Sequence, residues 1–203
     1  MAPSFTLTSA AGASVAPGGS IPIPLITAAA NGFKSAVALS VTGLPPGVTA
    51  SFAPTRIPSP GSGTSTLTLA PAAGTAPGVY TLTLTATGGN VTKTQAFTLT
   101  VLTPSFTLTS SAASANVAAG GSGRITLTTA PVNGFRSAIA LSVSPTPKGV
   151  TAQFAPASIA SPGFGTSTLT VSVARGTPAG TCTLTVTAVG GGATKTQTLS
   201  LAY

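Results

Sequence analysis

Residues 63–68 read Gly-Thr-Ser-Thr-Leu-Thr, and residues 165–170 repeat these six residues without a change. In the first copy, Leu67 and Leu69 alternate with Thr66 and Thr68. Strict alternation of apolar and polar residues is the pattern of a β-strand with one buried face, and threonine is favoured in strands because its side chain is β-branched. The stretch therefore predicts a strand whose leucines enter a core, and its recurrence predicts a second copy of the same sheet.

The repeat extends over nearly all of the 203 residues. It begins with Pro3-Ser4-Phe5-Thr6-Leu7-Thr8, which recurs as residues 104–109. After a one-residue insertion, further segments recur at a constant spacing of 102 positions: residues 31–33 as 133–135, 47–50 as 149–152, and 92–95 as 194–197. Because internal self-similarity marks repeated structural units, we predict one domain over residues 3–101, a short linker at 102–104 and a second domain over 105–203.

Seven period-two runs, bounded by Gly, Pro or Asn, predict seven strands in the first copy. Seven short strands in about one hundred residues, without helical periodicity, favour a two-sheet sandwich over a barrel. Pro22 and Pro24 cannot donate backbone hydrogen bonds, so the second strand should be irregular or exposed along one edge. The expected inward-facing residues are Phe5, Leu7, Ile21, Ile23, Leu25, Val37, Leu39, Val41, Val48, Ala50, Phe52, Leu67, Leu69, Tyr80, Leu82, Leu84, Phe97, Leu99 and Val101.

Two segments resemble a known family pattern: Gly43-Leu44-Pro45-Pro46-Gly47-Val48-Thr49-Ala50 and Ala76-Pro77-Gly78-Val79-Tyr80-Thr81-Leu82-Thr83. They are similar to bacterial immunoglobulin-like and fibronectin-III-like domains of surface proteins and secreted enzymes, including the domain associated with galactose-binding modules of secreted hydrolases. The resemblance implies an all-β chain of two tandem seven-stranded immunoglobulin-like β-sandwiches in an extracellular or cell-surface setting. It transfers no functional residue. Tyr80 resembles a structural corner tyrosine of such sandwiches, and Cys182 holds the equivalent position in the second copy.

The chain contains eight Lys and Arg residues but no Asp, Glu or His. General acid–base catalysis near neutral pH usually needs a carboxylate or an imidazole, and sites for zinc or calcium need carboxylate, imidazole or thiolate clusters. We therefore predict no catalytic residue, no metal site and no cofactor, so that the chain is not an enzyme. Cys182 is interpreted as a small buried apolar residue rather than a nucleophile.

Three basic residues, Lys34, Arg56 and Lys93, fall in or beside predicted loops that share one pole of the first sandwich. They form a candidate weak site for an anionic polymer, or else they are solvated charges that keep the protein soluble. Arg136 and Lys195 fall at the same pole of the second copy and are candidate interdomain residues. Specific nucleic-acid binding is not expected, because the chain has no Trp and most of its ten Phe and Tyr residues take inward positions.

No run of eighteen apolar residues is present, so no membrane span is predicted, and no signal segment precedes the first strand. We expect that such a segment was removed and that Met1 is not native. Without Asp, Glu or His, the net charge should stay close to +8 from about pH 4.5 to 7. Folding should therefore be insensitive to acid.

The predicted function is a non-catalytic structural or adhesion module, a tandem spacer at a bacterial surface or in a secreted protein. One alternative is a self-assembling subunit of an extracellular fibre or virion decoration, because an uncharged, threonine-rich surface and exposed strand edges favour lateral association. Another alternative is a carbohydrate-binding appendage of a secreted hydrolase. The expected partner is accordingly a cell-surface or insoluble polysaccharide, or a second copy of the chain.

Overall fold

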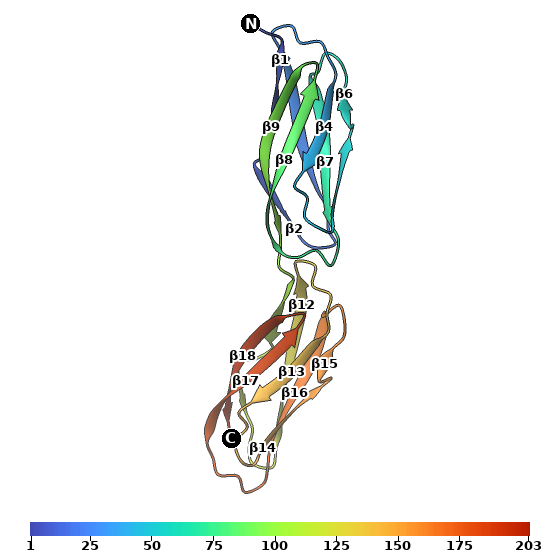
Figure 1. Cartoon of the computed structure of the whole chain (residues 1–203). Coiled ribbons are helices and arrows are strands. Elements are labelled where there is room, and N and C mark those ends of the chain that lie inside the picture. Colours follow the sequence, from blue (N-terminus) through green and yellow to red (C-terminus); the bar gives the residue numbers. More distant parts are fainter. The chain divides into compact units, whose positions relative to one another are not determined.

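The computed structural model describes residues 1–203 and consists of strands without any helix. The chain divides into two compact units, Met1–Thr103 and Pro104–Tyr203, called domain 1 and domain 2 below. In Figure 1 domain 1 is coloured from blue to green and domain 2 from yellow-green to red. Each domain is a sandwich of one four-stranded and one five-stranded sheet. No helix long and apolar enough to cross a membrane is present.

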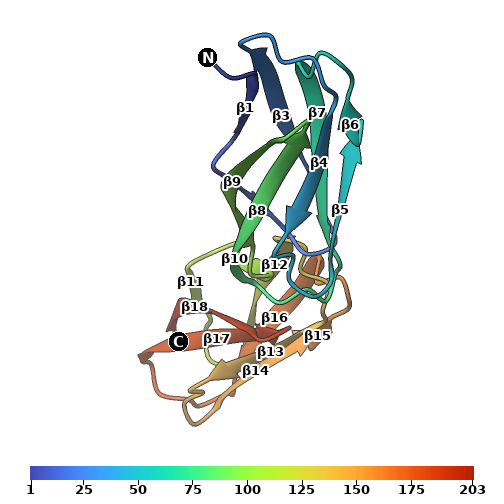
Figure 2. The same cartoon turned by 45° about the horizontal axis from the view of Figure 1, so that its top comes forward.

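Domain 1 contains strands β1 to β9, most of which are labelled in Figure 2. Neighbouring strands are antiparallel except for β2 and β9, which run parallel. The four-stranded sheet has the order β1 (Ser4–Ser9), β3 (Ile21–Ala30), β7 (Gly63–Pro71) and β5 (Val48–Ala53). The five-stranded sheet has the order β2 (Gly12–Val15), β9 (Val91–Val101), β8 (Gly78–Gly88), β4 (Val37–Thr42) and β6 (Arg56–Ile57).

Domain 2 repeats this topology strand for strand. Its four-stranded sheet has the order β10 (Ser105–Ser110), β12 (Ser122–Val132), β16 (Gly165–Val173) and β14 (Val150–Ala155). Its five-stranded sheet has the order β11 (Ser114–Asn116), β18 (Ala193–Ala202), β17 (Thr181–Gly190), β13 (Ile139–Ser144) and β15 (Ser158–Ile159). The prediction of an all-β chain of two tandem immunoglobulin-like sandwiches is confirmed by these sheets.

All seven strands predicted for the first copy are present, and each domain has two further short strands. In domain 1 these are β2, which has four residues and pairs with β9 after the chain has crossed from one sheet to the other, and β6, which has two residues and pairs with β4. Alternation needs at least four to eight residues to indicate a strand. Segments of two to four residues therefore lie at or below the length at which the sequence pattern is informative.

The core of each domain consists of the inward faces that alternation predicts. In domain 1 the side chains of Leu67, Leu69, Leu82, Leu84 and Leu99 are fully buried. Burying each leucine stabilises the fold by about 1.5–3 kcal/mol relative to leaving it exposed. The remaining predicted inward residues are buried, or half-buried against this cluster. The inward assignments for the first copy are therefore confirmed.

A pair of phenylalanines closes one end of each core. The ring centroids of Phe5 and Phe33 lie 5.1 Å apart, and those of Phe106 and Phe135 lie 5.2 Å apart. The chain reaches Phe33 through Asn31 and Gly32, whose φ angles are 52° and 75°. Asn-Gly pairs favour this left-handed turn because few other residues adopt positive φ without strain. The repeated Asn-Gly-Phe motif therefore places one core residue in each domain.

The strand that contains Pro22 and Pro24 is continuous, but half of it is exposed along one edge. β1 pairs with β3 only between Leu25 and Ala30, whereas β7 pairs with it from Ile21 onward. In domain 2 the residue equivalent to Pro24 is Thr126, whose N–H donates to Ser111 Oγ at 3.0 Å, on the β10 side and away from β16. The N–H groups that the two prolines lack would therefore point to the side where β1 is absent, and the hydrogen bonds between β3 and β7 are not interrupted.

Candidate functional site

The three basic residues predicted to share a pole of domain 1 are all exposed. Lys34 follows the turn after β3, and its carbonyl oxygen accepts a hydrogen bond from Ser59 Oγ at 2.6 Å. It also lines a hollow of about 550 Å³, together with residues of the β8–β9 hairpin. The structure therefore brings the β3–β4, β6–β7 and β8–β9 connections to one end of the domain.

Arg56 and Lys93 nevertheless leave the five-stranded sheet on opposite faces. Arg56 stands opposite the exposed Ala38, whereas Lys93 stands opposite the buried Ala86. Residues directly opposite each other on antiparallel strands project to the same face, so Arg56 points outward and Lys93 leaves from the face that carries the core. Only Lys34 of the three lines the hollow. The three positive charges thus share an end of the domain without forming one surface.

Arg136 and Lys195 occupy the matching places in domain 2, and both are exposed. The carbonyl oxygen of Arg136 accepts a hydrogen bond from Ser161 Oγ at 2.7 Å, which repeats the contact between Ser59 and Lys34. Lys195 stands opposite the buried Ala188 in the β17–β18 pair, as Lys93 does opposite Ala86.

Tyr80 and Cys182 are half-buried against the cores of their domains. The Tyr80 hydroxyl donates to the carbonyl oxygen of Ala76 at 2.8 Å, and its ring covers Gly78, where an added Cβ would lie 3.4 Å from Tyr80 Cζ. In domain 2 the ring of Tyr203 covers the equivalent Gly180, with a corresponding distance of 3.2 Å. Burial raises the pKa of the Cys182 thiol. The ring of Tyr203, one residue past the end of β18, thus replaces the ring that Cys182 lacks.

The other end of domain 2 is a framework of three connections, called the three-loop end below. It consists of residues 118–121 before β12, 145–149 before β14 and 174–180 before β17. The N–H of Gly120 donates to Val173 O at 2.8 Å, the N–H of Val173 to Gly121 O at 3.1 Å, and the N–H of Ala174 to Gly149 O at 2.8 Å. These backbone bonds hold the three connections against one another.

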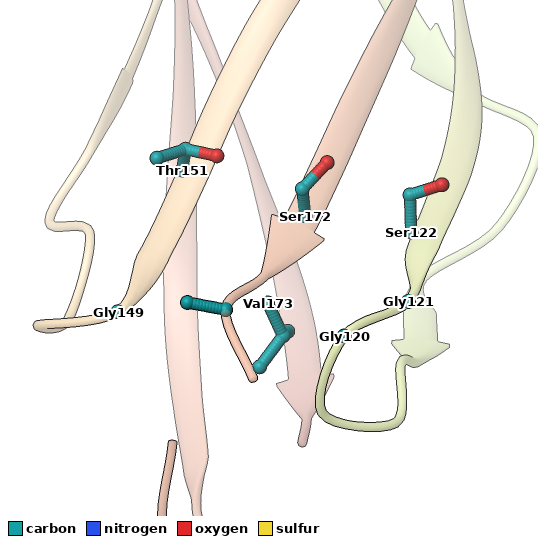
Figure 3. A pocket seen from close by; sticks show the side chains of 8 residues that line it. Gly120, Gly121, Ser122, Gly149, Thr151, Ser172 and Val173 are labelled. Atoms are coloured by element: carbon teal, nitrogen blue, oxygen red, sulfur yellow. The ribbon is translucent and has the colours of Figure 1, made fainter. Parts of the chain in front are cut away.

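Two adjoining hollows of about 420 Å³ and 600 Å³ lie at the three-loop end and share Gly149 and Ala174. Figure 3 shows the smaller one, where the side chains of Ser122, Ser172 and Thr151 stand in a row. They come from the neighbouring strands β12, β16 and β14 and are cross-strand partners. Two spacings between strands make this row about 10 Å long. The hollow therefore has hydroxyl groups along one side and polar backbone beside them.

Three basic side chains lie at or near these hollows, and none of them was predicted from the sequence to belong to a site. Lys148 and Arg175 line the larger hollow, and Arg124 stands two residues after Ser122 on the same face of β12. The stem of Arg175 lies over Gly120, because a Cβ added to this glycine would be 2.9 Å from Arg175 Cγ.

Comparison of the two copies marks these three residues as differences, although it does not show that they lie together. Position by position, Arg124, Lys148 and Arg175 replace Pro22, Pro46 and Ala73 of domain 1. A search for residues that the two copies share overlooks these three positions, because the copies differ there.

No family model matches the chain, and no curated protein matches it. Among solved structures, the titin domains Z1Z2 in complex with telethonin align at 17% identity, over 100% of this chain and 96% of theirs, with a TM-score of 0.49. Domains 4 and 5 of the S-layer protein SbsC align at 16% identity over 98% of each chain, with a TM-score of 0.42. A family 123 glycoside hydrolase from Clostridium perfringens aligns at 11% identity over 50% of this chain and 27% of its own, with a TM-score of 0.39.

Proposed function

We propose that this chain is a non-catalytic structural and adhesion module, which acts as a tandem spacer at a bacterial surface or within a secreted protein. The observation that carries this proposal is the completeness of each domain. Each sandwich encloses its own core, and no buried side-chain nitrogen or oxygen lacks a hydrogen-bond partner. Buried polar atoms without partners are rare in native structures, and a catalytic role is one of the reasons for which they are kept. A module whose interior holds none is suited to bearing a load or separating other parts.

The chemistry of the surface supports the same proposal. The strand faces that point to solvent carry mainly threonine and serine, and the chain has no Asp, Glu or His. Hydroxyl groups and scattered cations can form hydrogen bonds and attract anions, but they cannot supply a general acid and base near neutral pH. Binding at an extracellular surface is therefore the activity that these side chains can best support.

The sheet edges favour a spacer over a self-assembling fibre. In domain 1 the edge strands β1 and β5 have six residues each, and β2 and β6 have four and two. These edges are shorter than the inner strands β3, β7, β8 and β9, which have 9 to 11 residues, and a shorter edge limits the number of backbone groups that a second chain can pair with. Copies that each carry a charge of +8 without any Asp or Glu also repel one another.

Sedimentation velocity at two concentrations a hundredfold apart, followed by negative-stain electron microscopy, tests this proposal. We expect one sedimentation coefficient, at the mass of a single chain, under both conditions. Single particles should be seen on the grid. Ordered filaments, or a sedimentation coefficient that rises steadily with concentration, would replace the spacer with a self-assembling subunit.

A further inference from the structure

We propose that the three-loop end of domain 2 binds an anionic glycan, meaning a polysaccharide chain that carries carboxylate or sulfate groups. The contacts would come from Arg124, Lys148 and Arg175, together with the hydroxyl row of Ser122, Ser172 and Thr151. This inference rests on the adhesion role proposed above and names the chemistry of its partner.

Within domain 2, the distribution of charge between the repeats separates this end from the rest of the surface, whereas in domain 1 Arg56 alone lacks a basic counterpart, because Ser158 takes its place. Lys34 and Lys93 of domain 1 have the basic counterparts Arg136 and Lys195 in domain 2. Arg124, Lys148 and Arg175 have none, because domain 1 carries Pro22, Pro46 and Ala73 at these positions. Lys148 and Arg175 line the larger hollow, and Arg124 stands two residues after Ser122, which lines the smaller one. Scattered solubilising charges would have no reason to collect around one concavity.

The hydroxyl row is also particular to domain 2. Ser172 replaces Ala70 at the middle of the row. Ser122 lies within strand β12, whereas its counterpart Ser20 precedes β3. Domain 1 therefore lacks both the charges and the complete line of hydroxyl groups at this end.

Backbone geometry shapes the loops around the hollows. Val173 donates its N–H to Gly121, a bond that domain 1 cannot form because Pro71 has no N–H at this position. Gly120 has a φ of 83° and leaves space for the stem of Arg175 to lie across the loop. An arginine whose stem lies along a loop loses less conformational freedom on binding than one that moves freely.

The chemistry of this surface favours a glycan over a nucleic acid. Sugar hydroxyl groups both donate and accept hydrogen bonds, as the serine and threonine hydroxyls of the row do. Acidic groups along the chain would pair with the three cations, and no acidic side chain is present in the protein to compete for them. No aromatic residue lines either hollow, whereas proteins that bind single-stranded nucleic acid rely on aromatic stacking.

The test compares two triple variants of the full chain by isothermal titration with polygalacturonate, dextran sulfate and uncharged dextran. The site variant is Arg124→Gln, Lys148→Gln and Arg175→Gln, and the control variant is Lys34→Gln, Arg56→Gln and Lys93→Gln. Both variants lose three charges and carry +5 instead of +8. All six residues are exposed, so both variants should fold, which unchanged melting temperatures would verify.

We expect the wild-type chain to bind at least one of the two anionic glycans, and the one that binds better identifies carboxylate or sulfate as the preferred group. The site variant should bind it about tenfold more weakly or worse, and the slope of log K against log salt should fall by about two to three units, because each lost cation contact removes roughly one. The control variant should lose less than about threefold.

Three results would overturn the assignment. The first is equal weakening of both variants, which would show that binding depends on net charge alone. The second is the absence of binding by the wild-type chain at low salt. The third is tighter binding of duplex or single-stranded DNA than of either glycan, through the same three residues. If no glycan binds, the spacer proposal still stands, because it is tested by whether the protein sediments as a single chain. Filament formation would overturn the spacer without changing the glycan titration, so the two proposals fail separately.

Discussion

The Tyr80 side chain contacts Gly78 through its ring and forms a hydrogen bond through its hydroxyl. Domain 2 has no hydroxyl at the equivalent position, which is Cys182. In domain 1 the hydroxyl donates to Ala76 O at 2.8 Å while the ring covers Gly78. In domain 2 the ring over Gly180 comes from Tyr203, which stands where domain 1 has Val101. Two compensating exchanges, Tyr80 to Cys182 and Val101 to Tyr203, thus keep an aromatic ring at the end of the sheet. The ring is the shared requirement, and the hydrogen bond is specific to domain 1.

This difference predicts the outcome of removing each hydroxyl. Tyr80→Phe should lower the free energy of unfolding of domain 1 by about 0.5–1.5 kcal/mol, the usual net contribution of one hydrogen bond. Tyr203→Phe, the matched control, should change domain 2 by less than about 0.5 kcal/mol. Native-state hydrogen exchange measures this, because it reports the two domains separately. Equal losses of protection in both variants would show that the Tyr80 hydrogen bond contributes nothing specific.

At the scale of the strand, Pro22 and Pro24 protect an open edge. Residues 21–24 of strand β3 have no paired strand on the β1 side, and an unpaired strand edge is a template for another chain. Proline presents no N–H to such a partner. Both side chains are exposed, so they contribute little to the core. Their role is therefore expected to lie in preventing association rather than in stability.

Replacing both prolines tests this role. Pro22→Thr with Pro24→Thr should restore two N–H groups on the open side of β3, and the sedimentation coefficient should then rise with concentration. The free energy of unfolding should change by less than about 1 kcal/mol. The control is Pro46→Thr with Pro77→Thr, which removes two exposed prolines from loops. If the variant and the control both sediment as single chains, the prolines do not guard the edge.

The strands also show how far sequence patterns reach. Alternation identified the seven longer strands of domain 1 and their inward faces, because a side-chain period of two is visible in any run of five or six residues. It missed β2 and β6, which are too short to show a period. It placed Arg56 and Lys93 near one end but could not show that they leave opposite faces of a sheet, since that depends on the register of four strands, β6, β4, β8 and β9.

The three-loop end was beyond sequence analysis for a related reason. Arg124, Lys148 and Arg175 are separated by 24 and 27 positions, and only the sandwich topology brings their strands and loops to one end. No motif marks them. Alignment of the two copies shows that they differ from Pro22, Pro46 and Ala73, but it does not show that the three differences lie together.

At the scale of the whole molecule, the composition fixes how stability depends on pH. The free energy of unfolding varies with pH only where the unfolded and folded chains bind different numbers of protons. Asp, Glu and His are the side chains that titrate between about pH 3 and 7, and none is present. The chain-terminal carboxyl is the one carboxylic acid. Acid therefore finds almost no group whose protonation would favour the unfolded chain.

Cys182 makes the free energy of unfolding depend on pH in the alkaline range. Burial raises the pKa of its thiol in the folded chain above the ordinary value of 9.0, so the unfolded chain releases this proton at lower pH than the folded one. The associated stability is fully present below about pH 9 and is lost as the pH rises through the folded-state pKa. This contribution therefore leaves the acid range untouched and belongs to domain 2 alone.

These considerations predict a melting temperature that falls by less than about 5 °C between pH 7 and pH 3 at constant salt. Above pH 9 domain 2 should lose hydrogen-exchange protection as its thiol ionises, and Cys182→Ala should abolish this loss. Calorimetry at fixed ionic strength, with hydrogen exchange to separate the domains, measures both effects. A larger fall in acid would contradict this account, because it would require a group whose protonation favours the unfolded chain. An alkaline loss that persists in Cys182→Ala would assign it to groups other than the thiol.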